Sequence, residues 1–341
     1  MDLRKAVPLL LVSVALPGSA CSRSRAEVIE QTRDLRGIPF TIRVYAEPSD
    51  ELWSAIGEAF DRVTELQQKL NEWVPDSDVS RLNEAAGAET PVPVSAEMFR
   101  VLTVAREISE RSGGAFDVTW AVLRQAWGSF DASDIDPNSK PFRAKVERLR
   151  EKIGWEKLEL DPVAGTARLA ERGMQLGLGG VAKGFAIDEA GAVLIRRGFS
   201  NFVIDGGGDV LVHGRRGGRD WTVGLRHPRG TPDETFTIVP TRDRAVATTG
   251  DYERFLVVGG VRYSHIIDPR TGRPITNRVV SASVLAPDCT LADGLATAVM
   301  VMGAGDGLAL LERLDGVEGL IVTESPDGRL EDHATSGLRL E

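Results

Sequence analysis

The stretch MQLGLGGVAKGFAIDEAGAVLIRRGFSNFVID, residues 174–205, contains the alternation of elements on which the fold class depends. Its short apolar run at 174–178 predicts a strand, and the glycines that follow predict a turn. The apolar spacing from Ala182 to Arg197 predicts a helix, and Phe202–Ile204 predicts the next strand. A strand, a glycine turn, a helix and a further strand are therefore expected within 32 residues.

Helical patterns dominate the chain before this stretch, after one expected strand at 40–44. Ser49 can cap a long helix whose apolar residues recur at helical spacing as far as Trp73. Ser95 can cap a second helix, which Gly113 ends. A polar loop is expected at 131–141, and a third helix at about 143–153.

Strand patterns dominate the later part. Strands are expected at 158–160, 221–225, 236–239, 255–258 and 279–285, with helices at about 291–302 and 306–314. Early helices and later strands favour the α+β class. We predict a single globular domain of mostly antiparallel sheet with packed helices, arranged as two intimate halves. We place it at 34–330, with a polar tether at 21–33 and a tail at 331–341.

The composition is that of an ordinary globular protein. The chain has 341 residues, 42% of them hydrophobic, which is enough for a sizeable core. Its net charge of -9 argues against nucleic acid as a partner, because that affinity comes largely from Lys and Arg.

The first 20 residues predict a signal peptide. Arg4 and Lys5 precede an apolar run at 6–16 that is too short to span a bilayer stably. Small residues before Cys21 resemble a bacterial lipoprotein processing site, although Gly18 stands where Leu is usual. We expect lipidation of Cys21, with simple cleavage after Ala20 as the alternative. A lipidated Cys21 would leave Cys289 without a disulfide partner.

Two motifs near the C-terminal end point to chemistry. In YSHIIDPRTGRP, residues 263–274, a strand ends in His265 and runs into a rigid turn. In ADGLAT, residues 292–297, Asp293 and Thr297 stand four apart and so share one helix face. Their oxygens are hard ligands that suit Mg²⁺ or Ca²⁺. Taken singly, each motif favours the ordinary explanation: a salt-bridged turn for the first, and a helix with an Asp near its N-terminus for the second.

Glycine-rich segments add candidate sites. GLGGVAKG, residues 177–184, joins a strand to a helix and predicts an anion cradle with Lys183, or else a tight packing turn. It is not a P-loop, because no Ser or Thr follows the lysine. DGGGD, residues 205–209, predicts a close approach to a ligand or backbone, or a hairpin turn. Trp73, at the end of an apolar stripe, is typical of a core residue.

Together these motifs resemble the bacterial FAD:protein FMN transferases, or ApbE-type flavin transferases, formerly called thiamine-biosynthesis lipoproteins. The resemblance runs from about Gly37 to Gly319. It covers DSDVSRLN at 76–83, GAFDVT at 114–119, GGVAKG at 179–184 with Asp188, GGD at 207–209, TGDY at 249–252, SHIIDP at 264–269, and Asp293 with Thr297.

The resemblance implies a Mg²⁺-dependent transfer of FMN from FAD to a Thr or Ser hydroxyl of an acceptor protein, with release of AMP. It implies that Mg²⁺ is bound by Asp293, Thr297 and the Gly180 carbonyl, and that His265 is the catalytic base. The implied FAD contacts are Trp73, Ala115, Phe116, Asp117, Lys183 and Ile267, so Trp73 becomes a flavin platform.

The implied setting is the periplasmic face of the bacterial inner membrane, with a lipid anchor or as a soluble periplasmic protein, and with a membrane redox subunit as acceptor. The chain departs from the family at Gly177, where Asp is usual, and at Arg36, Asp205 and Thr249, where Met, Asn and Ser are common. The alternatives are a Mg²⁺-dependent FAD pyrophosphatase and a non-catalytic periplasmic flavin-binding lipoprotein.

Overall fold

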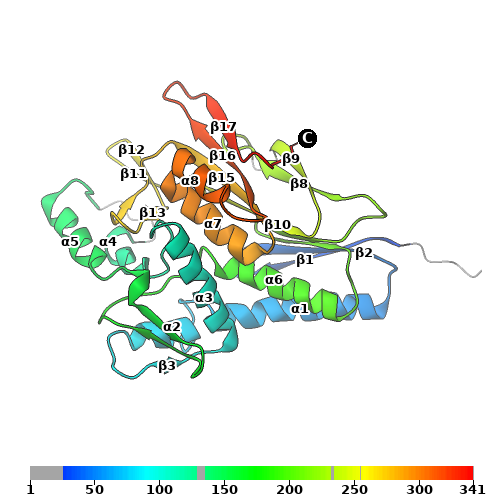
Figure 1. Cartoon of the computed structure of the whole chain (residues 1–341), viewed down its shortest axis with the longest axis horizontal. Coiled ribbons are helices and arrows are strands. Elements are labelled where there is room, and N and C mark those ends of the chain that lie inside the picture. Colours follow the sequence, from blue (N-terminus) through cyan, green and yellow to red (C-terminus); the bar gives the residue numbers. More distant parts are fainter. Residues whose placement is uncertain (1–25, 129–134, 232–233, 254, 341) are drawn as a thin grey trace, which may run out of the picture.

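A computed structural model of the chain describes residues 26–128, 135–231, 234–253 and 255–340. At its centre is an eight-stranded sheet in which every neighbouring pair is antiparallel (Figure 1). In spatial order its strands are β1 (Glu27–Leu35), β2 (Ile38–Ala46), β6 (Phe202–Gly206), β7 (Asp209–His213), β10 (Arg244–Gly250), β15 (Val279–Ala286), β16 (Glu318–Glu324) and β17 (Leu330–Ala334). The expected α+β class with a mostly antiparallel sheet is confirmed.

Helices α1, α6 and α7 lie together on one side of this sheet (Figure 1). The α-helices of the described residues are α1 (Asp50–Lys69), α2 (Asp78–Glu84), α3 (Ala96–Arg111), α4 (Arg124–Trp127), α5 (Lys140–Arg150), α6 (Ala182–Arg196), α7 (Cys289–Met302) and α8 (Ala304–Leu311). The expected caps are present: the Ser49 and Ser95 hydroxyls accept from Leu52 N and Met98 N. Helix α7 is buried on nearly all sides, yet it carries Asp293. A buried carboxylate in such a helix requires a partner.

The opposite face of the sheet packs against a hairpin. Strands β8 (Trp221–Arg226) and β9 (Thr235–Thr241) contribute Trp221, Val223 and Val239 to an apolar cluster with the sheet residues Val212 and Val246. The other short elements are β3 (Val92–Pro93), β4 (Leu158–Asp161), β5 (Thr166–Leu169), β11 (Phe255–Val258), β12 (Val261–Ser264), β13 (Ile267–Asp268), β14 (Arg273–Pro274) and the 3₁₀ turns η1 (Ala121–Leu123) and η2 (Trp155–Lys157).

A separate apolar cluster lies around Trp127. The Trp127 ring meets Phe142 of α5 edge-on at 4.8 Å between centroids, and Tyr263 of β12 at 6.1 Å. Its indole N–H donates to the Gly272 carbonyl oxygen at 2.9 Å. We call α4, α5 and residues 255–274 the Trp127 lobe, because this cluster joins them. In Figure 1 the lobe lies at the end of the molecule where α5, β11 and β12 are labelled.

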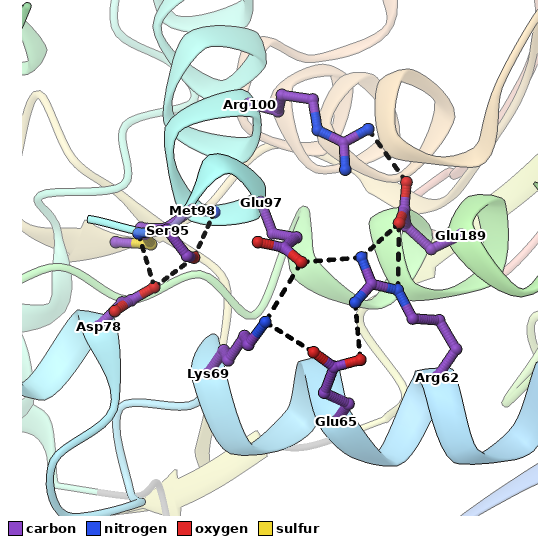
Figure 2. Close-up of polar contacts among 9 residues, drawn as sticks. All are labelled: Arg62, Glu65, Lys69, Asp78, Ser95, Glu97, Met98, Arg100 and Glu189. Carbon is purple, nitrogen blue, oxygen red and sulfur yellow. Dashed lines mark hydrogen bonds and ion pairs between the residues drawn. The ribbon is translucent and has the colours of Figure 1, made fainter. Parts of the chain in front are cut away.

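Ion pairs join the helices of the other region. Arg62 of α1 reaches Glu189 of α6 at 2.6 Å and Glu97 of α3 at 2.9 Å (Figure 2). Arg100 of α3 also reaches Glu189, at 3.0 Å. Nearby, the Asp78 carboxylate of α2 accepts from Ser95 N at 3.1 Å, and so links α2 to the start of α3 (Figure 2). These contacts fix four helices against one another, including α6, which starts at the candidate site.

Several sequence-based boundaries need correction. Residues 27–33, expected in the tether, belong to β1, and residues 331–334, expected in the tail, belong to β17. The expected strand at 174–178 is absent from the described structure, where Gln175 forms only an isolated bridge with Trp120. The reason is that the Leu176 and Gly177 amides donate to the Asn83 side chain and the Val118 carbonyl. The third helix begins at Lys140, so it includes the end of the expected loop.

The 205–209 motif is a hairpin turn, as one of its two interpretations predicted. Gly207 and Gly208 have φ of 63° and 96° and connect β6 to β7. The expected signal peptide and Cys21 lie outside the described residues. Among the residues that are described, no helix combines the length and apolar character needed to cross a bilayer.

Candidate active site

The glycine turn at 177–181 leads directly into α6. Val181 N and Ala182 N both donate to the Leu178 carbonyl, at 3.0 and 2.9 Å, and so close the turn. Val181, at the N-cap, supplies no side-chain hydrogen bond to the first turn. Backbone N–H groups at such a helix start attract anions. Because Val181 N and Ala182 N already donate to Leu178, the anion cradle predicted from the sequence stays a prediction.

Helices α6 and α7 meet at their N-terminal ends and exchange hydrogen bonds. Gly184 N in α6 donates to Asp293 Oδ2 in α7 at 3.2 Å. In return, the Asp188 carboxylate of α6 accepts from Cys289 N and Thr290 N of α7, each at 2.8 Å. A Cβ at Gly184 would lie 2.2 Å from the Cys289 carbonyl oxygen, so only glycine allows this approach. The first turns of the two helices are thereby held together.

The three expected metal ligands come together here. A Cβ at Gly180 would lie 3.1 Å from Thr297 Oγ1, and the Gly180 carbonyl oxygen lies 3.8 Å from the position of a Cβ at Gly294. The face of α7 that carries Asp293 and Thr297 therefore passes along the Gly180–Gly184 turn. Asp293 is buried and Thr297 is partly exposed.

Charge is concentrated beside these residues. Lys183 Nζ lies 2.8 Å from Asp209 Oδ2, and the Asp209 side chain is buried. Burial opposes the charge on Lys183, but Asp209 and Asp293 outweigh it and raise the pKa of this ammonium. Burial, together with the charge of Asp209, raises the pKa of Asp293 to about 7. Two carboxylates and one ammonium leave a surplus of negative charge.

The donor set fits a hard divalent cation. A carboxylate, a hydroxyl and a peptide carbonyl are all oxygen ligands of the type that Mg²⁺ and Ca²⁺ prefer. A cation would also balance the surplus charge of Asp293 and Asp209. No three His, Cys, Asp or Glu side chains form a metal-binding group within the described ranges, so a cation here needs the Thr297 hydroxyl and the Gly180 carbonyl.

The 115–117 segment borders the turn. Phe116 Cε2 would be 3.3 Å from a Cβ at Gly180, so its ring lies beside the expected metal ligands. The Asp117 carboxylate is used internally: it accepts from Thr119 N at 2.8 Å and from Trp155 N at 2.9 Å. Burial raises the pKa of Asp117 to about 6. The observed role of this carboxylate is to fix the segment; FAD contacts of Ala115, Phe116 and Asp117 stay predictions.

Trp73 is 68% exposed, which excludes a core role. The Arg124 guanidinium lies over its ring at 5.1 Å from the centroid and over the Trp120 ring at 4.7 Å. Arg124 Nη2 is also held at 2.7 Å by Glu72 Oε1. An exposed, positioned indole is suitable for stacking on a planar ligand.

Ala121 restricts the space at Gly177. A Cβ there would lie 2.9 Å from Ala121 Cβ, and 3.1 Å from Arg124 Nη2 at the flexible end of its side chain. Sequence reasoning missed Arg124 and Trp120. The signal in the sequence was Gly177, where the family usually has aspartate. Its neighbour Arg124 is 53 residues away in the chain, so their proximity becomes visible only in the fold.

His265 is half-buried between β12 and β13. The chain on its C-terminal side is braced, because the Asp268 carboxylate accepts from Arg270 N at 2.9 Å and from the Arg270 side chain. A Cβ at Gly114 would be 3.8 Å from Arg270 Cγ, which places this turn next to the 115–117 segment. The Ile267 side chain is buried in the Trp127 cluster. The catalytic role of His265 and an FAD contact by Ile267 stay predictions.

The candidate site thus lies where the starts of two helices meet at a glycine turn, on one side of an antiparallel sheet. The chain belongs to the ApbE family, whose model matches residues 37–321. It is 34% identical to an FAD:protein FMN transferase of Treponema pallidum, over 94% of this chain and 90% of the relative. It is 31% identical to one of Vibrio cholerae, over 92% of each chain.

Solved structures show the same fold. The flavin transferase ApbE from Vibrio cholerae superimposes with a TM-score of 0.77 at 31% identity, over 91% of this chain and 98% of that one. The apo form of the Pseudomonas stutzeri flavinyl transferase ApbE gives 0.78 at 27% identity, over 92% and 96%.

Proposed function

We propose that this chain is an FAD:protein FMN transferase, which moves FMN from FAD to a Thr or Ser hydroxyl of an acceptor protein and releases AMP. The observation that carries the proposal is the convergence of Asp293, Thr297 and the Gly180 carbonyl at the start of α6. The family relatives named above, which span nearly the whole chain, support the same activity.

FAD binding is assigned to two regions. The glycine turn before α6 is assigned to the pyrophosphate, and Lys183 contributes positive charge beside it. The isoalloxazine ring stacks on Trp73, whose exposed indole is held by Arg124. Phe116 and its neighbours line the space between these regions.

Mg²⁺ is assigned to Asp293, Thr297 and the Gly180 carbonyl. When bound, it neutralises charge on the FAD pyrophosphate, which is the main requirement of phosphoryl-type transfer. The chain contributes the three oxygen ligands and keeps them in place through the α6–α7 contact. The Gly184 amide orients the Asp293 carboxylate.

His265 takes the proton of the acceptor hydroxyl. The hydroxyl oxygen forms a bond to the FMN phosphorus, and the bond from that phosphorus to the bridging oxygen breaks, so that AMP leaves with the electron pair. Histidine is the side chain that most often serves as general base in such a proton transfer. The braced turn at Asp268 limits the movement of His265.

Export and a lipid anchor at Cys21 would place the enzyme on the periplasmic face of the inner membrane, where a membrane redox subunit is the acceptor. The support is the basic and apolar start of the sequence followed by small residues and Cys21. Fractionation of cells expressing the wild type and Cys21→Ser tests this location. A Cys21→Ser protein that stays in the membrane fraction as fully as the wild type contradicts the anchor.

Transfer is tested by co-expressing the chain with a candidate acceptor and measuring covalent FMN on the acceptor by mass spectrometry. Incubation with FAD and Mg²⁺ alone then distinguishes a transferase from a pyrophosphatase. Rapid release of AMP and free FMN, with no adduct on any acceptor, would identify a pyrophosphatase.

A further inference from the structure

The β11–β12 hairpin of the Trp127 lobe has exposed apolar side chains on its outward face. Cross-strand partners point to the same side, so Phe255 and Ser264 share a face with Val257 and Arg262. On that face Phe255 is 46% exposed and Val257 is 55% exposed. The reverse face packs inward through buried Leu256 and half-buried Tyr263. Phe255 and Val257 therefore expose apolar surface on this face, where the Arg262 guanidinium lies over the Phe255 ring at 4.1 Å and Ser264 at the end of the strand is buried. On the reverse face the end of the hairpin is exposed at Val261.

The hairpin is also free to accept a further strand. In the described part of the chain, β11 and β12 form a two-stranded sheet of their own and pair with no other strand. Exposed strand edges bind extended peptides through main-chain hydrogen bonds, while neighbouring side chains supply selectivity. The apolar outward face would add contacts for such a peptide.

The hairpin leads directly to the proposed base. Strand β12 ends at Ser264, and His265 is the next residue. Ser264 Oγ accepts from Ile266 N at 3.2 Å, which bends the chain around His265. A peptide held along β12 would therefore reach the residue that takes the acceptor proton.

The rest of the lobe is basic, although the chain as a whole carries a net charge of -9. Helix α5 has five basic residues and one acidic residue, and residues 255–274 have three arginines and one aspartate. Arg262 and Arg270 are partly neutralised by Asp251 and Asp268. The exposed side chains of α5 that form no ion pair within the described ranges are Lys140, Arg143, Lys145 and Arg148.

We propose that the Trp127 lobe is the docking surface for the acceptor protein, and that it binds an extended acceptor segment with apolar and acidic residues around the modified Thr or Ser. This inference rests on the proposed transferase function. The segment lies on the outward face of β11–β12, with Phe255 and Val257 as the apolar contacts, and its acidic residues face α5. Charge complementarity of this kind speeds encounter and orients the partner.

The test uses two synthetic peptides of about fifteen residues, a length that can cover both the hairpin and its flank. Both have one central Thr between apolar residues; one has flanking Asp and the other flanking Lys. The full chain is mixed with each fluorescently labelled peptide, with FAD and Mg²⁺, and binding is followed by anisotropy and covalent FMN by mass spectrometry. We expect tighter binding and labelling of the acidic peptide, both weakened by salt.

Two variants and one control locate the surface. Phe255→Ser with Val257→Ser should weaken binding of the acidic peptide roughly tenfold or more, as for loss of two central interface side chains. Arg143→Gln with Lys145→Gln and Arg148→Gln should remove the preference for the acidic peptide and its salt dependence. Ile238→Ser, which truncates a 39% exposed side chain on β9, should behave as the wild type. FAD binding should stay normal in all three proteins.

Equal binding of the two peptides, or full labelling by both variants, would overturn the docking surface while leaving the transferase function standing. The function itself fails separately, if no co-expressed acceptor ever receives FMN from the wild type. The wild type and the variants are also compared for binding to vesicles of phosphatidylcholine and phosphatidylglycerol. If the variants lose vesicle binding but keep peptide binding, the lobe is a membrane contact and the proposal is wrong.

Discussion

Substitution of Gly184 by alanine tests whether the contact between α6 and α7 builds the site. The added Cβ would lie 2.2 Å from the Cys289 carbonyl oxygen, 2.6 Å from its carbonyl carbon and 2.9 Å from Thr290 N. These are backbone atoms at the start of α7, so no rotamer change relieves the overlap. The two helices must separate by about 1 Å to restore ordinary contact distances.

That separation has a predictable energetic cost. Overpacking in a tightly packed region costs about 1–3 kcal/mol. The shift also lengthens the hydrogen bonds of Asp293 to Gly184 N and of Asp188 to Cys289 N and Thr290 N, each worth about 1 kcal/mol. We therefore expect Gly184→Ala to lower the free energy of unfolding by roughly 3–5 kcal/mol.

Urea unfolding of the wild type, Gly184→Ala and Gly305→Ala measures this effect. Gly305 lies in α8, and a Cβ there meets nothing within 4 Å, so Gly305→Ala should be neutral or stabilise by up to about 1 kcal/mol. Gly184→Ala should also bind Mg²⁺ and FAD more weakly under conditions where it is folded. Wild-type stability and wild-type Mg²⁺ dependence in Gly184→Ala would refute the idea that this contact places Asp293.

Four further predictions concern single side chains. Asp293→Ala should abolish FMN transfer at ordinary Mg²⁺ concentrations; full activity in chelator-treated protein would show that the metal site is misassigned. Trp73→Ala should weaken FAD binding by roughly 1–3 kcal/mol and reduce the quenching of tryptophan fluorescence by FAD. Unchanged FAD affinity in a folded variant would show that Trp73 does not stack on the flavin. His265→Ala should slow transfer at saturating FAD by roughly a hundred- to ten-thousand-fold, with FAD and Mg²⁺ affinity little changed; a near-normal saturated rate would contradict the base assignment. The pKa of Asp117 is raised to about 6 in the folded state, so the folded protein binds the Asp117 proton more tightly than the unfolded chain does. The free energy of unfolding should therefore fall as pH rises from about 4 to 6. Between about pH 4 and 7 the wild type should lose roughly 3 kcal/mol more than Asp117→Asn in urea unfolding, and parallel pH profiles would show that the pKa is not raised.

Local signals were sufficient for most of the helices. The Ser49 and Ser95 caps act within one turn, so the starts of α1 and α3 can be predicted from neighbouring residues alone. Strand β1 was missed because it is an edge strand with mixed exposure, and its sequence EVIEQTRDL lacks a clear apolar face. The apolar run at 174–178 resembles a strand, yet its amides bond to Asn83 and Val118, which only the fold brings near.

The site shows the same division between local and tertiary information. The spacing of Asp293 and Thr297 placed both on one helix face from sequence alone. The pairing of Lys183 with Asp209 and the contact of Arg124 with Trp73 depend on segments far apart in the chain. Such contacts follow from the packing of α6, η1 and the sheet, and no local pattern encodes them.

The most direct test of the central claim is mass spectrometry of an acceptor protein after co-expression with the wild-type chain or with Asp293→Ala. We expect FMN bound covalently to a Thr or Ser of the acceptor with the wild type, one AMP released for each FMN transferred in the purified reaction, and no adduct with Asp293→Ala. Free FMN and AMP without any adduct, or equal labelling by Asp293→Ala, would contradict it.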